Sequence, residues 1–135
     1  MWQRADKRRK KRLVRLLFKS YNYSMDTSKI ELLEYVSDDG KNIFRTWLHK
    51  LKDSTARARI RVRLNRVRLG NFGDCKSVGQ GVSELRIDYG SGYRVYFGKN
   101  GAVVVLLLCG GTKQSQAKDI RNAQKYWAQY QQRTT

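Results

Sequence analysis

Apolar and polar residues alternate with a period of two along residues 82–89 and again along residues 93–97. This period is typical of β-strands that bury one face. The apolar positions are Leu85, Ile87, Tyr89, Tyr93, Val95 and Phe97. The polar positions are Glu84, Arg86, Asp88, Arg94 and Tyr96. Residues 102–109 are almost unbroken aliphatic, which predicts a central strand covered on both faces.

Two turn signals separate these three strands, Gly-Ser-Gly at 90–92 and Asn-Gly at 100–101. If residues 90–92 form a three-residue loop, Ile87 pairs with Val95, Asp88 with Arg94, and Arg86 with Tyr96. A two-residue loop would instead set Ile87 against Arg94 and mix the faces, so the three-residue loop is preferred. The predicted sheet then has one apolar face and one face that carries Arg86, Arg94 and Tyr96.

Residues 29–36 predict an earlier strand, and two helices follow it. The first helix begins at residues 38–40 and runs to about residue 52, with an apolar stripe. The second runs over 55–69, capped by residues 53–55, and residues 70–81 read as a loop. Helical spacing recurs over 115–131. The expected fold is α+β, in the order β-α-α-β-β-β-α, with an antiparallel-dominated sheet, two helices packed on one face and a C-terminal helix.

The charge points to a polyanionic partner. The chain has 135 residues, which suits one small domain, with 29 Lys and Arg against 11 Asp and Glu, a formal charge of +18. Six arginines and no acid lie within the second predicted helix: Arg57, Arg61 and Arg68 flank one side of its apolar face, and Arg59, Arg63 and Arg66 the other. Phosphate contact is the favoured interpretation, and a solvated charged surface is the alternative.

Few residues suit metal or redox chemistry. Cys75 and Cys109 are far apart and lie in no metal-binding motif, so no metal or cofactor is expected, and reduced thiols suggest a cytoplasmic protein. The single histidine, His49, falls outside the apolar stripe of its helix and is expected on the surface. No apolar run reaches the length of a membrane span.

Residues 1–24 contain nine Lys or Arg and one acid, and Met25 follows them. Two interpretations remain open. The segment is either a basic arm that grips nucleic acid or an extension upstream of a domain formed by residues 25–135. The second is preferred because organised patterns begin only after Met25.

Three motifs together resemble the RelE/HigB-like toxins of bacterial toxin–antitoxin systems, most closely the phage-derived "addiction module killer" branch. They are ELR at 84–86, GYRVYF at 92–97 and GGTKxSQAxDI at 110–120, and the resemblance spans about residues 25–131. It implies a ribosome-dependent endoribonuclease that cuts mRNA and inhibits translation. The implied partners are the ribosome, mRNA and a helix-turn-helix antitoxin, without a membrane.

Matched residue by residue, the resemblance assigns catalytic roles to Arg86, Arg94 and Lys113. Glu84 stands where a lysine is common, and Asp119 stands near the place of a tyrosine that acts in some members, so one general base cannot be carried over. Tyr96, Asp119 or a lysine of lowered pKa are the candidates for that base.

The three cationic side chains suit the charge that develops on phosphorus when a 2′-hydroxyl attacks the phosphodiester. The residues expected to bind RNA around them are Arg57, Arg61, Arg68, Lys76 and Gln116. Purely structural alternatives also exist: Arg94 could pair with Asp88, and Tyr96 could pack over Arg86.

Three functions therefore remain open. The first is the mRNA-cleaving toxin. The second is a non-catalytic module that binds RNA or the ribosome, and the third is an interaction protein that docks an acidic antitoxin. Fold alone does not separate them.

Overall fold

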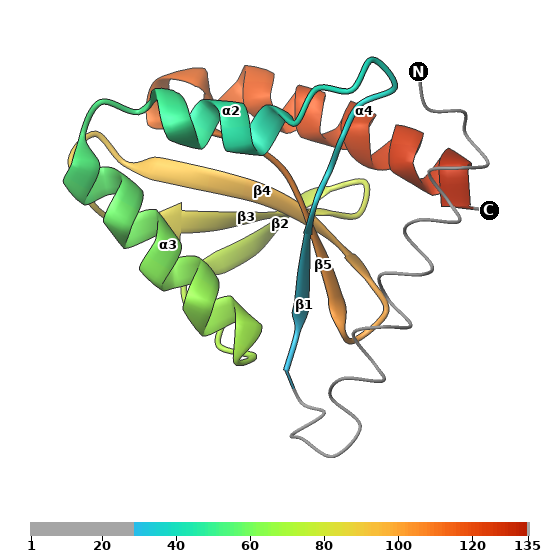
Figure 1. The fold of residues 1–135 in the computed structure, drawn as a ribbon, viewed down its shortest axis with the longest axis horizontal. Helices are drawn as coiled ribbons and strands as arrows, with labels where there is room; N and C mark the ends of the chain where they lie inside the picture. Colours follow the sequence, from blue (N-terminus) through green and yellow to red (C-terminus); the bar gives the residue numbers. More distant parts are fainter. Residues whose placement is uncertain (1–28, 135) are drawn as a thin grey trace.

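The computed structural model describes residues 29–134 of the chain. It contains a five-stranded sheet, three α-helices and one short 3₁₀ helix (Figure 1). The elements are β1 (Glu31–Glu34), α2 (Ile43–Lys50), α3 (Ser54–Arg68), β2 (Cys75–Gly79), β3 (Val82–Ile87), β4 (Tyr93–Asn100), β5 (Val104–Thr112), η1 (Lys113–Ser115) and α4 (Gln116–Thr134). The predicted α+β class is confirmed.

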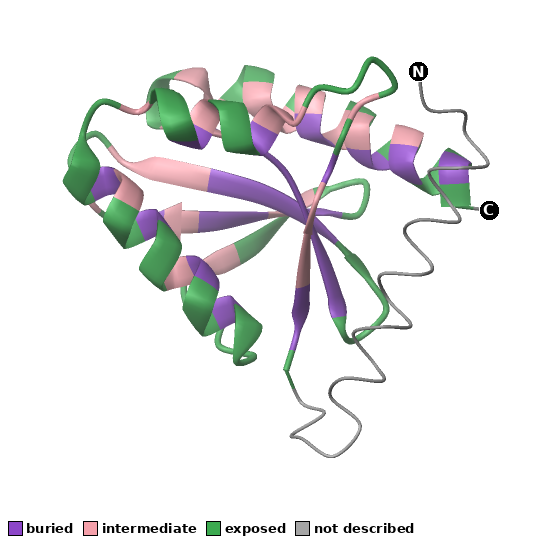
Figure 2. Cartoon of the chain, in the orientation of Figure 1, coloured by how far each residue is buried: buried purple, intermediate pink, exposed green. Residues whose placement is uncertain are grey.

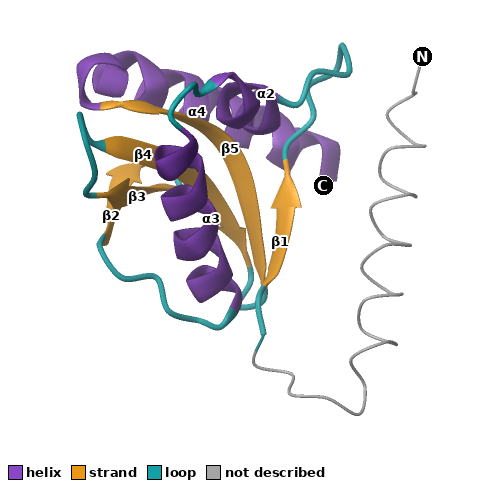
Figure 3. Cartoon of the chain, turned by 60° about the vertical axis from the view of Figure 1, so that its left-hand side comes forward, coloured by secondary structure: helices purple, strands orange, loops and turns teal. Residues whose placement is uncertain are grey.

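The strand order is β1-β5-β4-β3-β2, in which β1 runs parallel to β5 and the other neighbours are antiparallel. Helices cover both faces (Figures 1 and 3). One core, between the sheet and α2 and α3, includes Phe44, Ile60 and Val95. The other, between the sheet and α4, includes Tyr96 and Trp127. Buried residues accordingly follow the strands and the inward sides of the helices (Figure 2).

The helices form largely as their patterns predict. In α3 the residues Ala56, Ile60, Leu64 and Val67 are buried, and Asp53 caps the helix by accepting hydrogen bonds from the backbone of Thr55 and Ala56. The predicted start of the first helix is wrong. Residues 38–40 form a turn, and the cap is Asn42, whose side chain accepts from Arg45 N.

The predicted loop over residues 70–81 contains an additional strand, β2, so the observed order is β-α-α-β-β-β-β-α. A tight turn joins β2 to β3, and its central residues Gln80 and Gly81 both have positive φ, at 54° and 84°. Those angles are what a type I′ turn requires, and Gln80 adopts an angle that usually selects Gly, Asn or Asp. Because the turn carries an unusual residue and β2 is mostly exposed, the sequence shows neither alternation nor a standard turn signal there.

The register of β3 and β4 differs from the predicted one by two residues. Arg86 pairs with Arg94 and Glu84 with Tyr96, so residues 88–92 form a five-residue connection. The predicted pairs were therefore wrong, although the sorting of residues between the two faces was right, because a shift of two leaves every side chain on its own face. Tyr89 leaves the strand and lies in the connection.

A β-bulge and two glycines let α4 approach its face of the sheet. Tyr96 pairs with Cys109 and Phe97 with Leu107, so Leu108 has no partner across the ladder. A Cβ at Gly98 would collide with the ring of Trp127, and one at Gly111 would collide with the Asp119 carboxylate. These close contacts place the first turn of α4 directly on β5 and the middle of α4 directly on β4.

Among residues 29–134, no helix is both long enough and apolar enough to cross a membrane. The predicted domain boundary at residues 24 and 25 lies outside the described residues.

Candidate functional site

Two rows of side chains cross the sheet on the face that α4 covers. The first row joins Lys76, Glu84, Tyr96 and Cys109 on four successive strands. The second row joins Arg86, Arg94 and Gly111 on the three inner strands. Since each strand alternates its faces, residues paired in this way share one side of the sheet. The predicted convergence of Arg86, Arg94 and Tyr96 is confirmed.

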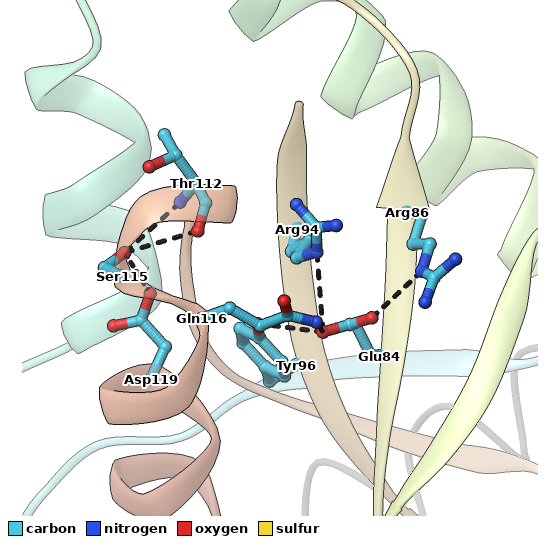
Figure 4. A network of polar contacts seen from close by, with 8 residues as sticks. All are labelled: Glu84, Arg86, Arg94, Tyr96, Thr112, Ser115, Gln116 and Asp119. Carbon is cyan, nitrogen blue, oxygen red and sulfur yellow. Dashed lines mark hydrogen bonds and ion pairs between the residues drawn. The ribbon is translucent and has the colours of Figure 1, made fainter. Parts of the chain in front are cut away.

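Glu84 is the centre of this arrangement. Its residue is 0% exposed, and its carboxylate has four partners from three elements (Figure 4). Oε2 accepts hydrogen bonds from the Tyr96 hydroxyl at 3.0 Å and from Gln116 Nε2 at 2.8 Å. Arg86 Nε donates to Oε1 at 3.1 Å, and Arg94 Nε forms an ion pair with Oε2 at 3.5 Å. We refer to these five residues as the Glu84 cluster.

The Glu84 carboxylate stays ionised. Burial alone would raise its pKa, but hydrogen bonds from Gln116, Arg86 and Tyr96, together with the charge of Arg94, hold the pKa below its ordinary 4.5. A buried carboxylate that is ionised near neutral pH orients the groups that bind it. The cluster therefore orients two guanidinium groups before any ligand binds.

Both arginines meet Glu84 through Nε. The terminal Nη nitrogens of Arg86 and Arg94 form no hydrogen bond with any residue from 29 to 134. Their side chains are 36% and 12% exposed. A guanidinium held in this way keeps an outer pair of donors for a second anion, and phosphate oxygens match that spacing.

A second polar group lies beside the cluster where α4 begins. Ser115 Oγ donates to Asp119 Oδ2 at 2.5 Å, above Gly111, which pairs with Arg94. The backbone N of Lys113 donates to Gly92 O at 3.1 Å, two residues before Arg94. Lys113 is exposed and Asp119 is half-buried. Both predicted residues therefore belong to the end of the sheet that carries the arginines.

Three titratable side chains, Tyr96, Cys109 and His49, are poorly suited to act as the general base. Burial first, then the charge of Glu84, raises the pKa of Tyr96, whose hydroxyl is already engaged as a donor to that carboxylate. Burial and the charge of Asp119 raise the pKa of Cys109 to about 12. His49 is exposed on α2, the helix that packs on the other face of the sheet. The expectation that His49 lies on the surface is confirmed.

The purely structural alternative for Arg94 was wrong in its choice of partner. Arg94 pairs with Glu84, while Asp88 lies exposed in the connection after β3. The Tyr96 hydroxyl also binds Glu84.

The predicted RNA-binding residues divide between the two faces. Lys76 and Gln116 adjoin Glu84, Lys76 as its cross-strand partner and Gln116 as a hydrogen-bond donor. Arg57, Arg61 and Arg68 lie on α3, which packs on the opposite face. Arg57 also donates to the carbonyl of Leu51, and Arg68 to Asn65. The structure therefore does not bring all five into one site.

Arg63 does not extend into solvent as the helix pattern suggested. Its Nη1 donates to Phe72 O at 3.0 Å, and its Nη2 donates to Asp74 O at 3.2 Å and to Arg86 O at 3.0 Å. The left-handed Gly73 makes room for this guanidinium, because a Cβ there would lie 2.5 Å from Nη1. Arg63 thus joins α3 to the backbone that carries Arg86.

Glu84 is the residue of the candidate site that the sequence interpretation did not include. Its alternation with Leu85 already placed it on the face of Arg86, and an acid at an inward strand position two residues from an arginine is a sign of a buried ion pair. Within residues 29–134, no group of three or more His, Cys, Asp or Glu side chains could hold a metal ion.

A Haemophilus influenzae protein described as an uncharacterized protein is 55% identical to this chain over 80 residues, which is 59% of this chain and 81% of that protein. The chain belongs to the same family as this Haemophilus protein. No family model matches the chain. The relationship assigns no activity by itself, so function has to be argued from the Glu84 cluster.

Proposed function

We propose that this chain is the toxin of a type II toxin–antitoxin system, a ribosome-dependent endoribonuclease of the RelE/HigB type that cuts mRNA. Its partners would be the ribosome with its mRNA and a helix-turn-helix antitoxin. The observation that carries the proposal is the pair of guanidiniums, Arg86 and Arg94, which share the buried Glu84 through Nε and keep their Nη donors for a phosphodiester.

The chemistry follows from this geometry. The 2′-oxygen attacks the neighbouring phosphorus, the bond to the 5′-oxygen breaks, and negative charge builds on the non-bridging oxygens. Arg86 and Arg94 would neutralise that charge without reorganising, since Glu84 already fixes them. Lys113, at the start of η1, would add a third positive charge. Proton transfer would fall to Lys113, Asp119 or a group of the ribosome rather than to Tyr96.

One observation favours a second candidate, a non-catalytic module that binds RNA or the ribosome and blocks translation without cutting. The pKa values of Tyr96 and Cys109 are raised, and His49 lies on α2, on the face of the sheet opposite the Glu84 cluster. The cluster therefore binds an anion readily but supplies no evident proton acceptor of its own. The two candidates share the binding step and differ only in whether the phosphodiester breaks.

The test is to induce the chain in bacteria and map mRNA 5′ ends together with ribosome positions. We expect new ends within translated codons, and we expect Arg94→Ala to abolish them. Arg66→Ala is the matched control, because it removes an exposed arginine of α3 without touching the cluster. Tyr96→Phe should retain cutting at reduced rate if the hydroxyl only orients Glu84.

Intact mRNA with stalled ribosomes would select the non-catalytic candidate. Normal growth and normal translation in cells that contain the folded chain would contradict both. Loss of cutting in Arg66→Ala to the same extent as in Arg94→Ala would show that total charge matters and that the oriented pair does not.

A further inference from the structure

The five-residue connection after β3 carries Tyr89 to the beginning of α3. The Tyr89 hydroxyl donates to Asp53 Oδ2 at 3.0 Å, and Asp53 is the residue that caps α3. This bond fixes the ring at one end, and partial packing against the α2/α3 core holds its edge. Tyr89 is therefore a half-buried ring whose hydroxyl is hydrogen-bonded to the cap of α3.

Two flat groups lie against this ring. Arg59 is exposed, and its Cζ lies 4.8 Å from the centroid of the Tyr89 ring. The centroid of the Tyr93 ring lies 6.4 Å from that of Tyr89, with an angle of 20° between the ring planes. Arg59, Tyr89 and Tyr93 thus lie next to one another, with Arg59 over the Tyr89 ring and the two rings nearly parallel, and we call these three residues the aromatic row.

The aromatic row and the Glu84 cluster flank the same end of the sheet. Tyr93 and Arg94 are consecutive in β4, so their side chains leave opposite faces of one strand. Ile87 and Arg86 stand opposite them at the end of β3, and the connection that holds Tyr89 joins the two strands. A strand of RNA that crosses this end would meet guanidiniums on one side and flat rings on the other.

We propose that the guanidinium of Arg59, supported from beneath by the Tyr89 ring, stacks one nucleobase of the single-stranded RNA whose phosphate lies at Arg86 and Arg94. The proposal rests on the proposed function, and it adds a subsite that binds a base by stacking, next to the site that binds the phosphate. Single-stranded RNA is commonly bound by stacking unpaired bases on aromatic rings or on guanidinium planes. Here both kinds of surface are already ordered, so little freedom is lost on binding.

Core packing alone explains only part of this arrangement. It accounts for the buried edge of Tyr89, which contacts the α2/α3 core. It does not account for an exposed guanidinium that lies over the ring while the nearby Asp53 carboxylate accepts from the tyrosine hydroxyl. A cation over a ring on a surface with a large excess of positive charge is suited to a polyanion that carries flat groups.

The experiment measures the affinity of the full chain for two short RNAs by fluorescence anisotropy at low salt. One RNA is an intact single strand, and the other has the same ribose-phosphate backbone without its central bases. The deciding quantity is the ratio of the two affinities. We expect the wild-type chain to prefer the intact RNA by about fivefold or more, the size of one stacked base.

The deciding variants keep the charge constant. Arg59→Lys removes the guanidinium plane and should reduce the ratio towards one, whereas Arg66→Lys, on the same helix and also exposed, should leave it unchanged. Tyr89→Phe should keep most of the ratio and Tyr89→Ala should lose it. Tyr126→Ala, which removes a half-buried tyrosine of α4 that stacks on Tyr35, controls for the loss of an aromatic ring.

The outcomes test the base-stacking subsite separately from the proposed function. Equal affinity of the wild-type chain for both RNAs, or equal losses for both RNAs in Arg59→Lys and Tyr89→Ala, would overturn the base-stacking subsite. Loss of binding to both RNAs in Arg94→Ala would still support the phosphate site in that case. If the wild-type chain binds neither RNA, the base-stacking subsite is overturned together with direct RNA binding.

Discussion

The Glu84 cluster and the outer surface of α3 both present arginines, yet the two regions orient them in different ways. In the cluster, a fully buried carboxylate fixes Arg86 and Arg94 from beneath. On α3, Arg61 and Arg66 are exposed, and their guanidinium groups form no hydrogen bond or ion pair with the described part of the chain. The first region is suited to hold one phosphate in one geometry, and the second to attract a polyanion in many geometries. Positive charge alone therefore does not identify a site, whereas an anchored guanidinium does.

The largest effect should come from removing the anchor. We expect Glu84→Gln to lower the free energy of unfolding by about 3 kcal/mol, because two guanidiniums lose their buried counter-ion. Urea denaturation measures this change. Glu34→Gln is the matched control, since Glu34 binds the exposed Arg45 at 2.6 Å and such surface pairs contribute less than about 1 kcal/mol. Equal losses in the two variants would contradict the distinction between the regions.

The next prediction compares the loss of stability on replacing two arginines of α3 that are two residues apart. Arg63→Ala should cost about 2 kcal/mol, because three backbone carbonyls lose their donor. Arg61→Ala should change stability by less than about 0.5 kcal/mol, as is usual for an exposed side chain. Thermal unfolding of the two variants gives the comparison. An Arg63→Ala chain as stable as the wild-type chain would mean that this guanidinium is not needed to hold α3 against β2 and β3.

A smaller effect should appear in acid. The pKa of Glu84 is held below 4.5 in the folded chain, so its ion pairs contribute fully above about pH 4.5 and are lost as the pH falls through the folded pKa. The stability difference between the wild-type chain and Glu84→Gln should therefore be constant near neutral pH and shrink below pH 4.5. Unfolding measured across that range tests the sign. A difference that grows in acid would show that folding raises the pKa of Glu84 above its ordinary value instead of lowering it.

The smallest effect concerns the exposed surface of α3. Arg61→Ala should weaken RNA binding slightly and reduce the slope of log affinity against log salt by about 0.7, the value for one phosphate contact on a single strand. Binding titrations at several salt concentrations provide the slope. An unchanged slope would show that Arg61 contacts solvent and no phosphate. A slope change several times larger would mean that α3 contributes more to binding than the cluster does.

The strands β3 and β4, which carry Arg86 and Arg94, show which features of the fold local sequence patterns predict. Alternation sorted Arg86, Arg94 and Tyr96 onto one face, and this assignment survived an error of two residues in the pairing of β3 with β4. The helix predicted over residues 55–69 matches α3 closely, and four residues of α3 are buried. Strand β2 was missed, because an exposed edge strand with polar residues has no apolar period to reveal it.

The sequence by itself determined the α+β class, the two faces of the sheet, the excess of positive charge and the candidate residues Arg86 and Arg94. Those features depend on local periodicity and composition, which residues near one another along the chain impose. Only the tertiary structure decided that Glu84 anchors both guanidiniums, that Arg63 turns inward and that Tyr89 meets Arg59. Those contacts join α3, α4 and separate strands, and burial and hydrogen bonding between distant segments select them when the chain packs.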